Sequence, residues 1–142
     1  MNINEIENLW EEDSKIDPDN LHLESIKIPS LHSKYHQIHN NISLLKKIEE
    51  NKLATIEKEK WLYYSGKASP EVYKETPFDH RVMKQDLDKY LRSDEDIVKV
   101  ITKIQYFQLM LDYLESILKT LHNRTFVIKN AIDWSKFSAG YD

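Results

Sequence analysis

Basic and aromatic residues lie close together in the stretch "EKEKWLYYSGK", residues 57 to 67. Lysine ammonium groups neutralise phosphates, and aromatic rings stack on unpaired bases whatever the base. On one helix, Lys60, Tyr64 and Lys67 would lie near a common face, whereas Lys58 would lie about 200° away from Lys60. The residue types therefore indicate a candidate single-stranded nucleic-acid contact.

The same stretch can also be the end of a purely structural helix. Tyr63 and Tyr64 would then continue an apolar stripe into the core, while the lysines pair with Glu57 and Glu59. Gly66 is a suitable residue for ending such a helix. The residue types alone leave both interpretations open.

Three histidines, His32, His36 and His39, fall at i, i+4 and i+7 of a helical pattern and form a candidate metal site. No accompanying ligand of the HExxH type is present, so we interpret them as exposed residues on a helix flank. Glycine-rich phosphate loops and nucleophile elbows are also absent from a sequence with only two glycines. The sequence predicts a protein that is not an enzyme and needs no metal or cofactor.

Length and composition restrict the class of protein. A chain of 142 residues without cysteine is expected to form a single domain, 1–142, without disulfides. Residues 1 to 30 contain eight acidic and two basic residues, a net charge of −6, whereas the chain as a whole is −4. The remaining residues therefore carry a charge of +2, which is compatible with a face that binds a polyanion.

No export signal or long apolar run is visible in the sequence. We therefore expect a soluble protein that is not exported and has no membrane partner.

The apolar spacing predicts an all-α fold, a long helical hairpin resembling a coiled coil. Residues 1–28 would form an acidic arm, with a short helix at 3–10 and an extended strip after Pro18. The part 29–92 would contain a long helix from Ser30 to Tyr64, a loop and a short helix over 81–92. The part 93–142 would contain a helix over 94–122, capped by Ser93, and a last helix over 124–137.

The predicted long helix has a consequence for assembly. Its 35 residues would span about 50 Å, whereas a compact chain of this length is about 40 Å across. The long helix and the broad apolar coverage of the last two helices favour an elongated subunit in a homo-oligomer. The alternative is an elongated monomeric helical hairpin.

Several collinear stretches resemble a known family. The pair Lys58 and Lys60 ahead of "YYSG", followed by "LRSDEDIVKVITKIQYFQLMLDY" and "LKTLHNRTFVIKNAIDWSKFSAG", is similar to the UvsY family of T-even-type phages. The resemblance covers roughly 16–140. Lys60 stands where the family has an arginine, so it keeps the charge without the planar fork, and Trp61 replaces an aliphatic residue.

The resemblance implies a recombination mediator that binds single-stranded DNA as a ring of six or seven subunits. Such a protein loads a RecA-like phage recombinase in place of the phage single-stranded-DNA-binding protein, during recombination-dependent repair and replication. It would act in the cytoplasm of the infected bacterial host. The alternative is a helical scaffold or adaptor that binds protein partners only.

The resemblance also implies sites. In the family, the two basic residues that match Lys58 and Lys60 contribute to DNA binding, and we add the neighbouring Tyr64 and Lys67. Self-association is attributed to the C-terminal region, which corresponds to the apolar last helix. The predicted oligomerisation residues are Phe126, Ile128, Ile132, Trp134 and Phe137.

Overall fold

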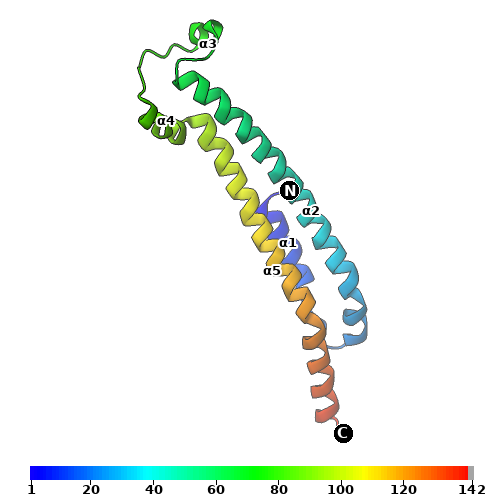
Figure 1. Ribbon diagram of the computed structural model, residues 1–142. Helices are drawn as coiled ribbons and strands as arrows, with labels where there is room; N and C mark the ends of the chain where they lie inside the picture. The colour runs from blue at the N-terminus through cyan, green and yellow to red at the C-terminus, as the bar shows by residue number, and fades with distance from the viewer. Residues whose placement is uncertain (141–142) are drawn as a thin grey trace. The chain divides into compact units, whose positions relative to one another are not determined.

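A computed structural model describes residues 1–140 of the chain, and within them every regular element is helical (Figure 1). The all-α prediction is confirmed. In chain order the elements are α1 (Ile3–Asp13), α2 (Leu21–Tyr64), α3 (Pro70–Glu75), the 3-10 turn η1 (Lys84–Asp86), α4 (Leu87–Ser93) and α5 (Glu95–Ser138). No helix among the described residues combines the length and the hydropathy that a membrane span requires.

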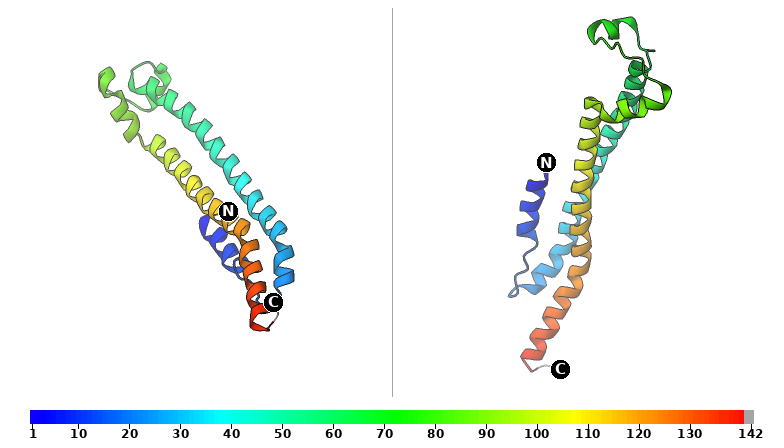
Figure 2. Two further views of the ribbon diagram at one scale, coloured as in Figure 1. Left: turned by 60° about the horizontal axis from the view of Figure 1, so that its bottom comes forward. Right: turned by 90° about the vertical axis from the view of Figure 1, so that its left-hand side faces the viewer.

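The chain forms two compact units. The first contains Met1–Ser43 and the chain from Leu109 onward, and the second contains Leu44–Gln108. The long helices α2 and α5 contribute to both. Within each unit, the stretches of α2 and α5 run side by side in opposite directions (Figure 2).

The first unit packs α1 against α2 and α5. The side chain of Asn2 accepts a hydrogen bond from the Glu5 amide at 2.9 Å, and the Glu5 carboxylate accepts one from the Asn2 amide at 3.3 Å. This reciprocal capping box starts α1. Ile6 is buried, and the Trp10 ring meets Tyr35 of α2 edge to face at 5.5 Å between centroids. The predicted short helix is confirmed and its apolar stripe is covered.

The second unit contains the end of α2 and the beginning of α5, connected by α3, η1 and α4. Its core includes Leu87, Ile97, Val100 and Phe107. After Tyr64 the chain turns at Gly66, whose φ is 78°. The Lys67 amide donates to the Leu62 carbonyl at 2.9 Å and the Gly66 amide to the Tyr63 carbonyl at 3.3 Å, the bonds of a Schellman motif. The predicted stop at Gly66 is confirmed.

The start of the long helix was predicted wrongly. Helix α2 begins at Leu21 rather than Ser30 and includes Pro29, so the expected extended strip does not exist. Proline removes only one backbone hydrogen bond and disturbs one turn. The apolar stripe continues backward from Leu31 at alternating steps of three and four residues through Ile28, the buried Glu24 and Leu21. Continuing the helix keeps this whole stripe on one side.

The two predicted C-terminal helices are a single helix, α5. A break was predicted between residues 122 and 124, but the buried stripe Leu114, Ile117, Leu121 continues through Arg124 to Ile128. Arg124 is itself buried and takes a core position. No glycine or proline interrupts this stretch, so nothing in the backbone favours a stop.

The connection between the long helices also differs in detail. The short helix predicted over 81–92 is the turn η1 followed by α4, which ends at Ser93, and the sequence reading missed α3. Ser93 does not cap α5, because its hydroxyl donates to the Lys89 carbonyl at 2.8 Å. The cap is Asp94, which accepts hydrogen bonds from the amides of Asp96 at 3.0 Å and Ile97 at 3.1 Å.

Candidate nucleic-acid interface

The cap residue Asp94 also connects α5 to the end of α2. Its Oδ2 accepts a hydrogen bond from the Tyr64 hydroxyl at 2.6 Å and lies 3.3 Å from Lys60 Nζ. Lys60 Nζ also lies 2.8 Å from Oδ2 of Asp96. The side chain of Asp94 is 4 % exposed, whereas that of Asp96 is 67 % exposed. Lys60 is therefore held by one buried and one exposed carboxylate.

These contacts shift the protonation equilibria of the three groups. Burial raises the pKa of Asp94, but the hydrogen bonds from Tyr64 and the Ile97 amide and the charge of Lys60 outweigh it, and the pKa lies below its usual value. Burial and then the hydrogen bond to Asp94 raise the pKa of the Tyr64 phenol. The hydrogen bond to Asp96 raises the pKa of Lys60, against an opposing effect of burial. At neutral pH Asp94 is thus an anion, Lys60 a cation and Tyr64 a neutral donor.

The rings at the end of α2 pack against one another. An aromatic cluster comprises Tyr63, Tyr64, Tyr73, Phe78 and Tyr90, all within the second unit. The Tyr64 centroid lies 5.2 Å from that of Phe78 and 5.6 Å from that of Tyr90, and Tyr63 stacks on Tyr73 at 5.5 Å. Such packing fastens the loop with α3 to the end of α2. The ring of Tyr64 is therefore engaged within the chain.

Trp61 presents a different environment. Its side chain is exposed, and the Lys67 ammonium lies 4.7 Å from the centroid of its ring, within cation–π range. Trp61 also lines a groove of about 510 Å³ together with Lys58 of α2 and Arg92 of α4. We call these four residues, Lys58, Trp61, Lys67 and Arg92, the Trp61 surface. Glu57 and Asp88 line the same groove, so charge alone does not make it strongly basic.

Lys60 lies on another groove of the second unit, also about 510 Å³ in volume. Neither Lys58 nor Trp61 lines this groove, which agrees with the predicted angular separation of Lys58 and Lys60. Of the four predicted DNA-binding residues, the structure groups Lys60 with Tyr64 at Asp94, and Lys58 with Lys67 around Trp61. Lys67 departs from the predicted common face because α2 ends at Tyr64, before Lys67.

Sequence reasoning left Trp61, Arg92 and the two aspartates out of the candidate site. Trp61 carried a signal, because it lies three residues after Lys58 and thus on nearly the same face of the helix. Arg92, Asp94 and Asp96 are about 30 residues away along the chain. Only the folded connection through α3 and α4 brings them to the end of α2.

The predicted oligomerisation residues have unequal exposure. Phe126, Trp134 and Phe137 are largely exposed, with 68 % of Trp134 accessible to solvent. The rings of Trp134 and Phe137 lie 5.8 Å apart. Ile128 is buried at 2 % exposure and Ile132 is half-buried. Ile128 thus belongs to the core of the first unit, and the three aromatic residues form the exposed apolar set.

The three histidines form a stack along α2. The ring centroids of His32 and His36 are 5.7 Å apart, and those of His36 and His39 are 6.5 Å apart. His39 Nε2 lies 3.2 Å from Oε1 of Glu115. Within residues 1–140, no group of three or more histidine, aspartate or glutamate side chains has the arrangement of a metal site.

Comparison with known proteins agrees with these features. The sequence model described as "Recombination, repair and ssDNA binding protein UvsY" matches residues 9–141. The "Recombination protein uvsY" of Enterobacteria phage T4 is 28 % identical over 141 residues, 99 % of either chain.

Solved structures give the same result. Two crystal structures of the bacteriophage T4 recombination mediator protein UvsY align with TM-scores of 0.87 and 0.85, both at 27 % identity. The first alignment covers 98 % of both chains, and the second covers 94 % of this chain and 98 % of the T4 chain. The resemblance predicted from the sequence is confirmed. The chain belongs to the UvsY family of recombination, repair and single-stranded-DNA-binding proteins.

Proposed function

We propose that this protein is a non-enzymatic recombination mediator. It binds single-stranded DNA as a homo-oligomer and loads a RecA-like phage recombinase in place of the phage single-stranded-DNA-binding protein, in the cytoplasm of the infected host. The observation that carries the proposal is the similarity, over nearly the whole chain, to T4 proteins described as a recombination mediator. The Trp61 surface supplies residue types suited to the ligand.

On the Trp61 surface, the three basic side chains contact phosphates and Trp61 stacks on a base. An exposed indole suits a ligand without fixed sequence, because every base has a π-face. Lys60 and Tyr64 have roles different from that of Trp61. Lys60 contacts a phosphate from the groove that it lines together with Asp96, and Tyr64 fixes the end of α2 through its hydrogen bond to Asp94.

Assembly compensates for the small charge of each subunit. The exposed rings of Phe126, Trp134 and Phe137 pack against a second copy of the chain, because such large apolar side chains favour burial in an interface. In a ring of six or seven subunits, each further contact with one strand is intramolecular and gains from effective concentration. Many weak contacts also allow the strand to be transferred stepwise to the recombinase.

The first test is fluorescence anisotropy of a labelled oligo(dT) strand over a range of salt concentrations. Lys58→Ala should make the slope of log K against log salt less negative by about 0.7, the effect of one phosphate contact on a single strand. Trp61→Leu should weaken the free energy of binding by about 1–3 kcal/mol per stacked base. The slope of log K against log salt should not change. Lys119→Ala, which removes an exposed lysine from the first unit, is the matched control.

The mediator activity needs a second measurement. Recombinase filaments should form faster on DNA covered by the single-stranded-DNA-binding protein when this protein is added, and Trp61→Leu should reduce the effect. If the wild-type protein fails to bind DNA at low salt, DNA binding is refuted and a scaffold for protein partners remains.

A further inference from the structure

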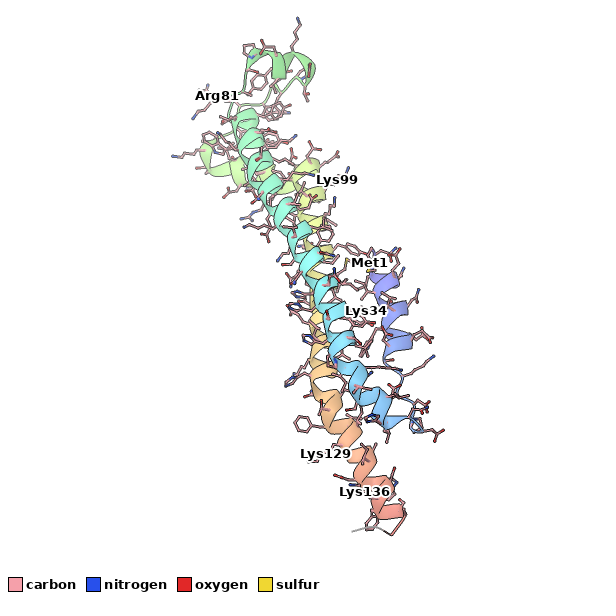
Figure 3. The ribbon with its side chains drawn as sticks, turned by 90° about the vertical axis from the view of Figure 1, so that its right-hand side faces the viewer. Met1, Lys34, Arg81, Lys99, Lys129 and Lys136 are labelled. Atoms are coloured by element: carbon pink, nitrogen blue, oxygen red, sulfur yellow. The ribbon has the colours of Figure 1, made fainter. Side chains whose placement is uncertain are left out.

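Lys60 lines a lysine-rich groove of the second unit. It lies between the end of α2 and the beginning of α5, where Figure 3 labels Lys99. We call it the lysine groove. Four lysines line it, with the acids Glu49, Glu59 and Asp96 and the apolar Ile56 and Val100; the lysines are Lys52, Lys60, Lys99 and Lys103.

Two lysines of the groove share a single carboxylate. Glu49 Oε1 lies 3.1 Å from Lys103 Nζ and 3.4 Å from Lys52 Nζ. Its side chain is only 7 % exposed, so it is largely buried at the base of these two lysines. The hydrogen bond from Lys103, together with the hydrogen bond from Lys52 and the positive charges of both lysines, holds the pKa of Glu49 below its usual value, although burial acts to raise it. One negative charge thus faces two positive charges, and a positive charge remains.

Lys99 adds a further positive charge, and with four lysines against three acids the lining of the groove has a net charge of +1. It is exposed, and within residues 1–140 no carboxylate lies within 4 Å of its ammonium. Lys99 and Lys103 are one helical turn apart on α5, about 6 Å along the axis. Both therefore lie on the same face of the helix and can contact one extended polyanion.

Asp96 differs from the other acids that bind these lysines. It lies 2.8 Å from Lys60, but its side chain is largely exposed and the Tyr64 and cap contacts belong to Asp94. Solvent screens an ion pair whose carboxylate is exposed, so the Asp96 partner contributes little to stability, although the Lys60 side chain is itself only 26 % exposed. A phosphate offers Lys60 the same charge-assisted hydrogen bonds as a carboxylate does. Replacing the Asp96 carboxylate by a phosphate as the partner of Lys60 therefore costs little free energy. The buried carboxylates of Asp94 and Glu49 keep their contacts.

We propose that the lysine groove is a second phosphate-binding face for single-stranded DNA, with Lys99 and Lys103 as contact residues, and that Asp96 is the internal anion that a phosphate displaces from Lys60. The proposal rests on the proposed DNA binding. It assigns separate contacts to Lys58 and Lys60, which line different grooves. Asp96 then sets the affinity, because it competes with the strand for Lys60.

The contact residues are tested with the variant that combines Lys99→Ala and Lys103→Ala. The slope of log K against log salt for oligo(dT) should become less negative by about 1.4, two contacts of about 0.7 each. At 0.1 M salt, the same two contacts correspond to a loss in affinity of about 25-fold if their contribution vanishes at 1 M salt. Lys119→Ala should leave the slope unchanged. Lys99→Ala alone, which breaks no ion pair, should give about half of the change in slope.

The competition is tested with Asp96→Asn. This change should raise the affinity for oligo(dT) by up to about fivefold, the contribution of an exposed ion pair. The gain should disappear when Lys60→Ala is also present, because the freed ammonium is then missing. Glu95→Gln, which removes the neighbouring exposed carboxylate, controls for the change in net charge. An equal gain in both neutralised variants, or a gain that survives Lys60→Ala, would overturn the competition.

The outcomes separate this inference from the proposed function. If wild-type protein binds DNA and depends on Lys58 and Trp61, but the lysine-groove variants bind with unchanged slope, the second face is wrong and the mediator function remains. If wild-type protein does not bind DNA at any salt concentration, both are wrong. Circular dichroism of each variant verifies that the helices are intact.

Discussion

At the scale of single residues, Asp94 connects the end of α2 to the beginning of α5. Its Oδ1 caps α5, and its Oδ2 accepts from Tyr64 and lies within ion-pair distance of Lys60. One carboxylate thus satisfies backbone donors of one helix and side-chain donors of another. A cap in this position fixes both the start of α5 and its attachment to α2.

We expect Asp94→Ala to lower the free energy of unfolding by about 2–4 kcal/mol. The lost cap accounts for about 1 kcal/mol, and the Tyr64 hydroxyl left without an acceptor accounts for about 1–3 kcal/mol. Urea denaturation followed by circular dichroism measures the change. Asp133→Ala, at an exposed position of α5, serves as control and should change the free energy by less than about 0.5 kcal/mol.

The lowered pKa of Asp94 predicts a pH dependence. A carboxyl group whose pKa is lower in the folded chain than in the unfolded chain stabilises the fold above its unfolded pKa. This stabilisation is lost as the pH falls below the usual value of 3.8 and through the folded pKa. Unfolding followed from pH 6 to pH 2 should show the loss, and Asp94→Asn should make it smaller. An unchanged pH profile in Asp94→Asn would contradict the assigned role.

The sequence predicted the positions of the candidate residues on α2 better than it predicted their partners. The end of one helix does bring together Lys58, Lys60, Tyr64 and Lys67. As expected, Lys58 and Lys60 lie on different sides of this helix and line different grooves. The partner of Lys60 was expected among neighbouring glutamates, but it is a pair of aspartates more than 30 residues later. Local spacing contains no information on such a contact, because the intervening loop decides it.

At the scale of elements, the heptad-like stripe predicted the helices, and local breaking signals misled their ends. Of the five apolar residues at coiled-coil spacing, Leu31, Tyr35, Ile38 and Ile42 lie on the buried side of α2, whereas Leu45 is exposed. Helix boundaries were predicted at Ser30 and near His122, yet both positions lie inside continuous helices. In both places a continuing stripe of buried residues outweighs a local preference, which a reading of short windows cannot detect.

Pro29 should therefore cost stability at its exposed site in α2. Pro29→Ala restores the backbone donor for the Ser25 carbonyl and should raise the free energy of unfolding by about 1–3 kcal/mol. Urea denaturation again gives the value. Ser30→Ala, one position further along, should change it by less than about 0.5 kcal/mol. A destabilised Pro29→Ala variant would contradict this expectation.

Arg124 connects α1 to α5 from its buried position. Its Nη2 donates to the carbonyls of Asp13 at 2.9 Å and Ser14 at 3.0 Å, and its guanidinium lies 5.6 Å from the Trp10 ring. Arg124→Leu keeps the stripe apolar but removes these bonds. We expect faster amide hydrogen exchange in α1 with little change at α4. Arg124→Lys should not restore protection, since it lacks the planar fork that reaches both carbonyls. Unchanged exchange in α1 would show that its apolar contacts suffice.

At the scale of the whole molecule, the proposed ring predicts that assembly and DNA affinity fall together. Trp134→Glu combined with Phe137→Glu places charge on the exposed apolar set and should yield smaller species in analytical ultracentrifugation. DNA affinity should fall as well, although these residues are outside both candidate DNA-binding grooves, because avidity is lost. Lys136→Glu changes charge on the same helical segment and controls for electrostatics. A native mass that is unchanged in the double variant would refute this interface.

The three tryptophans of the chain lie in three different surroundings. Trp10 packs against Tyr35 and Arg124, Trp61 lies under Lys67 at the proposed DNA surface, and Trp134 is exposed near the end of α5. Variants that retain one tryptophan each, with phenylalanine at the other two positions to keep an aromatic ring there, would therefore have emission spectra that report separately on docking of the N-terminal helix, on occupancy by a strand and on association of subunits. Stopped-flow fluorescence with such variants would give the order in which these three events occur.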